Sequence, residues 1–173
     1  MDMKLLNTIS KILVEQTSNV PLIFPATKWY PGGRYGEFRQ RYNNGQGGHH
    51  YANDIGFPVG TPLYAPHSGY VTTKPNAGSC GYMLIIGKTT DNYYSKFCHL
   101  LGFAVSNGQW VNAGELVGYS GGAKREFGAG NSTGPHLHWE FKVKGATKDP
   151  YKGYLDKSRL AESLEESEVN VYL

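Results

Sequence analysis

The sequence predicts a mainly β domain built on antiparallel pairing, and three observations support that fold class. The 173 residues include 23 Gly, 9 Pro and 13 Tyr, a composition typical of short strands joined by many turns. Between residues 54 and 143, runs of β-branched, aromatic and aliphatic residues alternate with turn sequences such as PNAG and SNG. The connections are also short, which favours antiparallel strands because parallel strands need long crossovers.

The first elements along the chain are predicted to be a helix and a loop arm. Apolar residues fall at helical spacing over residues 4–16, which predicts an amphipathic helix that packs on the domain or on a second copy. Residues 25–48 are rich in glycine, aromatic residues and arginine, and they read as a long loop arm that leads into the first histidines. Long loops in compact domains are often functional.

The central part of the chain supplies the predicted strands. Residues 155–168 after it are compatible with a short amphipathic helix that runs into an acidic tail. We therefore predict an N-terminal helix and lead-in over residues 1–24, a β domain over 25–154, and a C-terminal helix and tail over 155–173. The strands are expected at residues 62–65, 69–73, 82–87, 93–99, 116–119 and 136–143.

The charge distribution is uneven. The net charge is +3, but the acidic C-terminal segment leaves a balance of +6 for residues 1–155. Such a body would attract a polyanion, such as nucleic acid, an anionic membrane or a teichoic-acid-rich wall, although a solvated surface is the simpler interpretation. Nucleic-acid binding would rest on charge alone, so no nucleic-acid partner is expected. No run of about 18 apolar residues is present, so membrane insertion is not expected either.

The two cysteines, Cys80 and Cys98, are too few for a disulfide scaffold and form no CxxC motif. If the predicted strands 82–87 and 93–98 pair so that facing residue numbers sum to 178, these cysteines lie opposite each other and can form a disulfide. A one-residue change of register removes that contact, so both states stay open. Strand alternation predicts that Cys98 faces the opposite way from His99.

Histidines carry the candidate chemistry. In the HLH sequence, His136 and His138 are two residues apart on a predicted strand and therefore share a face. In GGHHYANDIG, His50 and Asp54 are four apart, which is one face on a strand and on a helix alike. His49 is five residues from Asp54 and is expected to face away. Spacing thus selects His50 as the partner of Asp54.

His50, Asp54 and His138 together supply two imidazoles and one carboxylate, a set suited to one zinc ion with an open position for water. Zinc lowers the pKa of such a water toward neutrality. His136 would then lie beside the metal, with His99 at the end of a strand. Either histidine could accept the water proton or stabilise an oxyanion, because imidazole titrates near working pH. No role is assigned to His67.

These motifs resemble one known family. GGHHYANDIGFPVGTPLYAPHSGYV, FCHLLG, VNAGELVGYSGG and STGPHLHWEF follow in order the pattern of the lysostaphin/LytM-type zinc endopeptidases, which cut peptide bonds in peptidoglycan. The resemblance covers roughly residues 45–145. It implies a curved antiparallel β-sheet of glucose-permease-IIA-like topology, with zinc in a groove between loops. It also implies zinc ligands at His50, Asp54 and His138, and catalytic histidines at His99 and His136.

Several further residues are candidates for substrate contact. Glu140 lies two residues past His138, so it shares that strand face and could orient a ligand. Thr133 belongs to the glycine-rich loop 121–134, which should form one wall of the groove. For each candidate, ordinary loop packing or a solvated surface is the simpler alternative. The other candidates are Tyr51, Asn53 and the aromatic residues Trp29, Tyr30, Tyr35 and Tyr42 of the arm.

The predicted function is zinc-dependent hydrolysis of peptide bonds in bacterial peptidoglycan, in a cross-bridge or in a stem peptide. The N-terminus lacks the pattern of a signal peptide. We therefore expect a phage protein, either at the tail tip beside other tail proteins or as a lysin made in the host cytoplasm. One alternative is a non-catalytic virion protein of the same fold that zinc stabilises. Another is a phosphocarrier module, which the HxxxD pair disfavours.

Overall fold

The computed structural model describes residues 22–40, 45–88 and 91–161. The helix expected at residues 4–16 and the side chain of Tyr42 lie outside these ranges. In the part described, strands predominate and most pair antiparallel, which confirms the predicted fold class. No helix among the described residues is long and apolar enough to cross a membrane.

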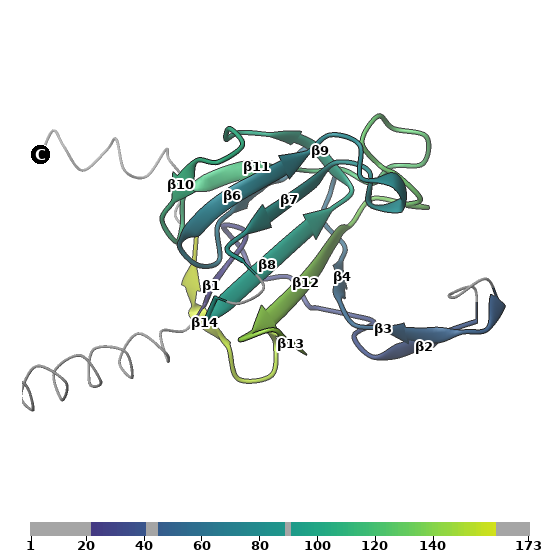
Figure 1. The fold of residues 1–173 in the computed structure, drawn as a ribbon, viewed down its shortest axis with the longest axis horizontal. Helices are drawn as coiled ribbons and strands as arrows, with labels where there is room; N and C mark the ends of the chain where they lie inside the picture. Colours follow the sequence, from purple (N-terminus) through teal and green to yellow (C-terminus); the bar gives the residue numbers. More distant parts are fainter. Residues whose placement is uncertain (1–21, 41–44, 89–90, 162–173) are drawn as a thin grey trace, which may run out of the picture.

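One large sheet carries most of the structure (Figure 1). Its strands lie in the order β10-β6-β7-β8-β12-β13, and β4 also pairs with β12. β4 and β13 pair with successive halves of β12, opposite its other neighbour β8. The strands are β4 (Asn53–Ile55), β6 (Gly69–Lys74), β7 (Met83–Ile86), β8 (Tyr93–Cys98), β10 (Trp110–Val111), β12 (Leu137–Val143) and β13 (Ala146–Lys148).

A second sheet of three strands has the order β5-β11-β9. These strands are β5 (Pro62–Tyr64), β9 (Leu100–Phe103) and β11 (Leu116–Ser120). Leu63 of β5 and Val117 of β11 are fully buried and join the same hydrophobic core as the large sheet. Burying this apolar surface is the main force that holds the two sheets together.

Strand alternation on β12 separates the core from the candidate site. Leu137, Trp139 and Phe141 are fully buried in the core, whereas His138 and Glu140 are only partly buried. Successive side chains of a strand point to opposite faces, so the polar residues between these core residues face away from the core. The pattern HLHWEF therefore places His138 on the sheet face that leads to solvent.

All six strands expected from the sequence are present, and each boundary agrees to within one residue. The expected loop arm at 25–48 is more ordered than predicted. It contains β2 (Glu37–Arg39), which pairs antiparallel with β3 (Gly48–His50). Figure 1 shows this β2–β3 hairpin projecting from the body of the molecule. The sequence did not predict this pairing because each strand has only three residues, too few to show an alternating pattern.

The helix expected from residue 155 is wrong for its described part. β14 (Leu155–Leu160) pairs in parallel with β1 (Leu22–Phe24), and Leu22 and Phe24 are buried in the core. This pairing with a distant strand overrides the local helical spacing. The packed body therefore extends beyond residues 25–154 at both ends.

Cys80 and Cys98 form a disulfide, with Cα atoms 5.0 Å apart. The strand register from which this disulfide was inferred, with facing residue numbers summing to 178, is nevertheless wrong. Leu84 of β7 lies opposite Phe97 of β8, three residues from the predicted partner. Cys80 lies outside β7, in a short 3-10 turn at Gly78–Cys80, and this turn returns it to the end of β8. The cysteines therefore meet through a turn and not as a cross-strand pair.

Candidate metal centre and active site

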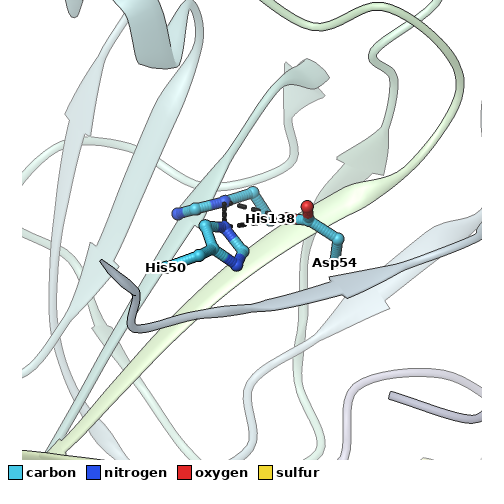
Figure 2. A group of neighbouring side chains, drawn as sticks. All are labelled: His50, Asp54 and His138. Carbon is cyan, nitrogen blue, oxygen red and sulfur yellow. Dashed lines mark hydrogen bonds and ion pairs between the residues drawn. The ribbon is translucent and has the colours of Figure 1, made fainter. Parts of the chain in front are cut away.

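Three short stretches of strand converge at the candidate metal centre (Figure 2). His50 is the last residue of β3, Asp54 is the middle residue of β4, and His138 lies near the start of β12. β4 and β12 pair in register, so Asp54 lies directly opposite His138. The sheet itself thus places the carboxylate beside the imidazole, and the chain between β3 and β4 returns His50 to the same point.

The facing atoms of these residues fit a single metal ion. His50 Nε2 lies 3.1 Å from His138 Nδ1 and 3.4 Å from Asp54 Oδ1. His138 Nδ1 lies 3.0 Å from Asp54 Oδ1. Tetrahedral zinc with bonds of about 2.0–2.1 Å separates its ligand atoms by about 3.3 Å, so the donor set and its spacing both suit zinc. The predicted ligands are therefore brought together; their role as ligands stays a prediction.

Backbone contacts fix which nitrogen of His50 faces the centre. Its Nδ1–H donates to the carbonyl of Arg34 at 3.0 Å, which turns Nε2 toward His138 and Asp54. The ring is almost completely buried, at 2% exposure. His49 points the other way, since it is exposed and its Nδ1 bonds to the Gly36 carbonyl. Alternation along β3 thus separates the two adjacent histidines, as the spacing predicted.

The electrostatics of the centre favour the ligand forms of its side chains. Burial alone would raise the pKa of Asp54, but its interactions with the side chains of His138, His50 and Arg39 outweigh burial and hold that pKa far below its usual range. Burial also lowers the pKa of His138, which disfavours the protonated ring. A metal ligand must be an ionised carboxylate or a neutral imidazole, so both groups are ready to bind.

Arg39 is a site residue that the sequence did not reveal. Its guanidinium donates a hydrogen bond to Asp54 Oδ2 at 2.8 Å, on the side away from the two histidines. Arg39 comes from β2 in the arm, so the arm takes part in the centre. The sequence did show that residues 25–48, which lead into His50, are rich in arginine. It did not show which of these arginines contacts the site.

His99 lies near this centre because of an unusual backbone conformation. It follows β8 directly, and its φ of 63° lies in the left-handed region, which is uncommon for residues other than glycine. Strand alternation therefore ends at Cys98. The prediction that Cys98 faces away from His99 and the metal is wrong, because both residues line the same groove and Cys98 lies opposite His138.

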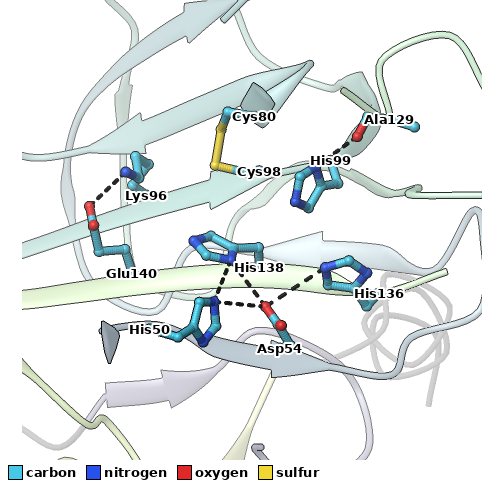
Figure 3. The surroundings of a disulfide bond; sticks show 10 residues. All are labelled: His50, Asp54, Cys80, Lys96, Cys98, His99, Ala129, His136, His138 and Glu140. Carbon is cyan, nitrogen blue, oxygen red and sulfur yellow. Dashed lines mark hydrogen bonds and ion pairs between the residues drawn. A yellow bond between two sulfur atoms is a disulfide. The ribbon is translucent and has the colours of Figure 1, made fainter. Parts of the chain in front are cut away.

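The two predicted catalytic histidines are neighbours, with ring centroids 4.9 Å apart (Figure 3). His99 Nδ1–H donates to the Ala129 carbonyl at 2.8 Å, and His136 Nδ1–H donates to the Gly134 carbonyl at 2.8 Å. In both rings Nε2 is left available, and that of His136 lies 3.7 Å from Asp54 Oδ1. Burial lowers the pKa of His99 to about 4. His99 is therefore neutral at pH 7 and can accept a proton.

Close backbone contacts anchor the loop that supplies the Ala129 carbonyl. A Cβ on Gly81 would lie 2.0 Å from the Gly128 carbonyl oxygen, and one on Gly130 would lie 2.4 Å from the Ser79 carbonyl oxygen. Both glycines also have positive φ. The glycines of loop 121–134 therefore let two backbones approach closely, and this approach places the carbonyl that orients His99.

An open groove of about 1210 Å³ adjoins the centre, and His50 lies buried behind its lining residues. Asp54, His99, His136 and His138 line it, and so does Thr133, as predicted for loop 121–134. Glu140 is directed to a different partner, because its carboxylate pairs with Lys96 Nζ at 2.8 Å. Lys96 itself lines the groove, and the sequence analysis did not single it out.

Other candidates for substrate contact lie elsewhere. Asn53 is 2% exposed and donates to Asp149 Oδ1 at 2.9 Å, so it faces the interior. Tyr51 is exposed beside Tyr35, and neither is among the described residues that line the groove. Trp29 and Tyr30 pack against the core phenylalanines, with ring centroids 4.8 Å and 4.5 Å from Phe24 and Phe57 respectively. The described aromatic residues of the arm therefore contribute to side-chain packing and do not line the groove.

Comparison with known proteins identifies related sequences. The sequence model of Peptidase family M23 matches residues 48–150. Peptidoglycan DD-endopeptidase ShyA of Vibrio cholerae is 34% identical over 96 residues, which are 56% of this chain and 21% of that protein. The chain spans 21–25% of the length of the first curated relatives it matches.

Solved structures show the same similarity. The catalytic domain of lysostaphin from Staphylococcus simulans has a TM-score of 0.53 at 29% identity, covering 70% of this chain and 90% of that one. The catalytic domain of the prophage-encoded M23 protein EnpA from Enterococcus faecalis has a TM-score of 0.55 at 26% identity. This match covers 75% of this chain and 96% of that one. Both are peptidase domains of similar extent to the strand-rich body described above.

Proposed function

The chain belongs to Peptidase family M23, and from this membership we propose that it is a zinc-dependent endopeptidase that hydrolyses peptide bonds in bacterial peptidoglycan. The observation that carries the proposal is the convergence of His50 Nε2, Asp54 Oδ1 and His138 Nδ1 within 3.4 Å of one another. They converge in a groove that also holds two histidines with available Nε2 atoms. The similarity to ShyA, a peptidoglycan DD-endopeptidase, supports the choice of substrate.

His50, Asp54 and His138 would hold the zinc ion. When bound, zinc polarises the scissile carbonyl and lowers the pKa of a coordinated water toward neutrality. The protein's own contribution is to keep the ligands in place before the metal arrives. The Arg34 carbonyl orients His50, pairing between β4 and β12 orients Asp54 and His138, and Arg39 holds the second oxygen of Asp54.

His99 and His136 would move protons at their Nε2 atoms. His99 is neutral at pH 7, and its Nδ1–H is held by the Ala129 carbonyl, so Nε2 can accept the proton of the attacking water. Once protonated, that ring becomes a donor toward the developing oxyanion or the leaving amine. His136 is oriented in the same way by the Gly134 carbonyl and can share these tasks.

Mass spectrometry of fragments released from purified cell walls tests this function. We expect new amino termini at one type of peptide bond, which disappear when a zinc chelator is added and return when zinc is restored. Intact walls in the presence of protein with stoichiometric zinc would contradict the endopeptidase proposal. That result would favour the alternative in which zinc only stabilises a structural virion protein.

We also propose that the protein acts in a phage, as a tail-tip component that contacts other tail proteins or as a lysin. Its support is the similarity to the prophage-encoded M23 protein EnpA. Proteomic detection in purified phage particles would support the tail role, and detection only in lysates of infected cells would support the lysin. Constitutive presence in the envelope of uninfected cells would contradict both.

A further inference from the structure

We propose that Lys96, held in place by Glu140, forms a subsite for a carboxylate of the substrate next to the metal centre. The protein would then prefer peptidoglycan peptides that carry a free carboxylate one or two residues from the scissile bond. This inference rests on the proposed function, since it assigns a substrate preference to the same groove.

The Lys96 side chain is positioned by a cross-strand ion pair. Lys96 on β8 lies directly opposite Glu140 on β12, and its Nζ lies 2.8 Å from Glu140 Oε2. Both side chains are partly buried, at 25% and 22% exposure. Lys96 lines the groove, whereas Glu140 is not among its described lining residues. Glu140 therefore holds the ammonium from behind and uses one of its three donors, which leaves donors for a ligand in the groove.

The subsite lies on the far side of the metal centre from the catalytic histidines. Figure 3 shows Lys96 and Glu140 on one side of His138, with His99 and His136 on the other. Along β12, Glu140 is two residues beyond His138, a rise of about 7 Å on the same face. An extended peptide covers about 3.3–3.6 Å per residue, so a carboxylate bound by Lys96 belongs one or two residues from the bond being cut.

The charges of the groove support an anionic substrate. Its charged lining residues are Arg34, Arg39, Lys96 and Asp54, an excess of cations. Arg39 pairs with Asp54 and Lys96 pairs with Glu140, so the net excess of positive charge comes from Arg34. Of the two members of the Lys96–Glu140 pair, Lys96 lines the described groove and Glu140 does not. A groove with this excess raises the local concentration of anionic ligands.

These features favour one class of peptidoglycan peptide. Stem peptides contain acidic and diamino-acid residues whose carboxylates lie near the cross-link. A glycine bridge has no carboxylate beside its internal bonds, so Lys96 would gain nothing from it. We therefore assign the protein to cleavage at a carboxylate-bearing stem-peptide cross-link rather than within a glycine bridge.

The experiment compares two soluble cross-linked muropeptides that differ only in whether the carboxylates beside the cross-link are free or amidated. The wild-type zinc-loaded protein should cleave the free-carboxylate form with a higher kcat/KM. Lys96→Gln should lower the ratio of kcat/KM values, free over amidated, by about tenfold, the size expected for one charge-assisted hydrogen bond. Glu140→Gln removes the competing negative charge but keeps an amide oxygen that can still accept a hydrogen bond from the Lys96 ammonium, so this ratio should stay at or above its wild-type value.

Lys74→Gln is the matched control, because it removes an exposed lysine on β6 that does not line the described groove. This variant should keep the wild-type ratio. Equal cleavage of the two muropeptides, or a preference that persists in Lys96→Gln, would overturn the subsite and leave the endopeptidase proposal intact. Cleavage of neither muropeptide by zinc-loaded protein would overturn both. Equal losses of the ratio in Lys96→Gln and Glu140→Gln would show that the pair acts only through the structure.

Discussion

Arg39 holds Oδ2 of Asp54 with a hydrogen bond of 2.8 Å, while Oδ1 of the same carboxylate faces His50 and His138. The two oxygens therefore have different tasks, one toward the arm and one toward the metal centre. The arm is thereby tied to the centre, and a carboxylate held in this way offers a single oxygen to a metal ion. Loss of a partner that orients a metal ligand typically weakens metal binding by about 10- to 100-fold.

Arg39→Ala should weaken zinc binding by about 10- to 100-fold, because Asp54 would lose the contact that fixes its orientation. The dissociation constant can be measured by competition with a chromogenic chelator. Arg34→Asn is the control, since asparagine tolerates the positive φ of 68° at this position and the backbone carbonyl that holds His50 is kept. Equal weakening by both substitutions would indicate a general charge effect and contradict a positioning role for Arg39.

Substitution of the two histidines of the HLH sequence should separate metal binding from catalysis. His138→Ala should lose zinc, whereas His136→Ala should retain zinc and lose activity by at least about a hundredfold, the usual contribution of a proton-transfer group. Metal content and turnover of cell-wall fragments are the two measurements. His49→Ala should change neither, because His49 faces outward beside His50. Equal zinc loss from the His136 and His138 variants would contradict this division of roles.

The disulfide should contribute to both stability and activity. Closing a loop of the size between Cys80 and Cys98 stabilises a fold by about 3 kcal/mol. The carbonyl of Cys80 also accepts a hydrogen bond from the His99 backbone N–H at 2.9 Å, so the bridge supports the left-handed turn at His99. Cys80→Ser/Cys98→Ser should therefore lower the free energy of unfolding by about this amount and reduce turnover.

Urea denaturation with and without a reductant that does not bind zinc checks this prediction. The reductant should destabilise the wild-type protein and have no effect on the double serine variant. If turnover survives the loss of the bridge unchanged, the turn at His99 does not depend on it.

His67 should make the stability of the protein depend on pH. Its ring is buried, Nε2 bonds to the Ser95 hydroxyl at 3.0 Å, and burial lowers its pKa to about 4 from an ordinary 6.5. Above pH 6.5 the ring is neutral in both states and its packing is undisturbed. As the pH falls from 6.5 toward 4, the unfolded chain binds a proton that the folded chain does not, and stability is lost. The loss from this one group is about 2 kcal/mol at pH 5.

Comparing urea unfolding at pH 5 and pH 7 in metal-free protein measures this effect. His67→Phe/Ser95→Ala replaces both polar partners, so the difference between the two pH values should shrink by about 2 kcal/mol. The other histidines contribute equally to both proteins and cancel in the comparison. An unchanged difference would mean that His67 titrates normally in the folded state.

The elements with strong local patterns could be predicted from the sequence. Runs of strand-forming residues between turn sequences located all six expected strands, and spacing alone separated His50 from His49. The pattern specified the strand face of His138, and the i,i+4 spacing of His50 and Asp54 specified their shared face without a predicted strand. His138, between the buried Leu137 and Trp139, is the clearest case.

The features that escaped prediction depend on backbone geometry or on distant partners. The left-handed φ of His99 reverses the direction expected for its side chain, and no residue type at that position signals it. β14 becomes a strand because β1 is there to pair with it, which no local window contains. Arg39 and Lys96 belong to the site through contacts across strands, so their importance became visible only once the register was known.

The parallel pairing of β1 with β14 has a consequence for how the molecule folds. Leu22 and Leu155 can become neighbours only after the whole chain between them has been synthesised. Contacts so distant in sequence form late, because closing the intervening loop costs entropy before any contact repays it. During synthesis β1 therefore stays unpaired with β14, and the domain can complete its folding only when residue 160 has left the ribosome. Chains that end before Leu155 should remain protease-sensitive, whereas chains that extend past Leu160 should become resistant.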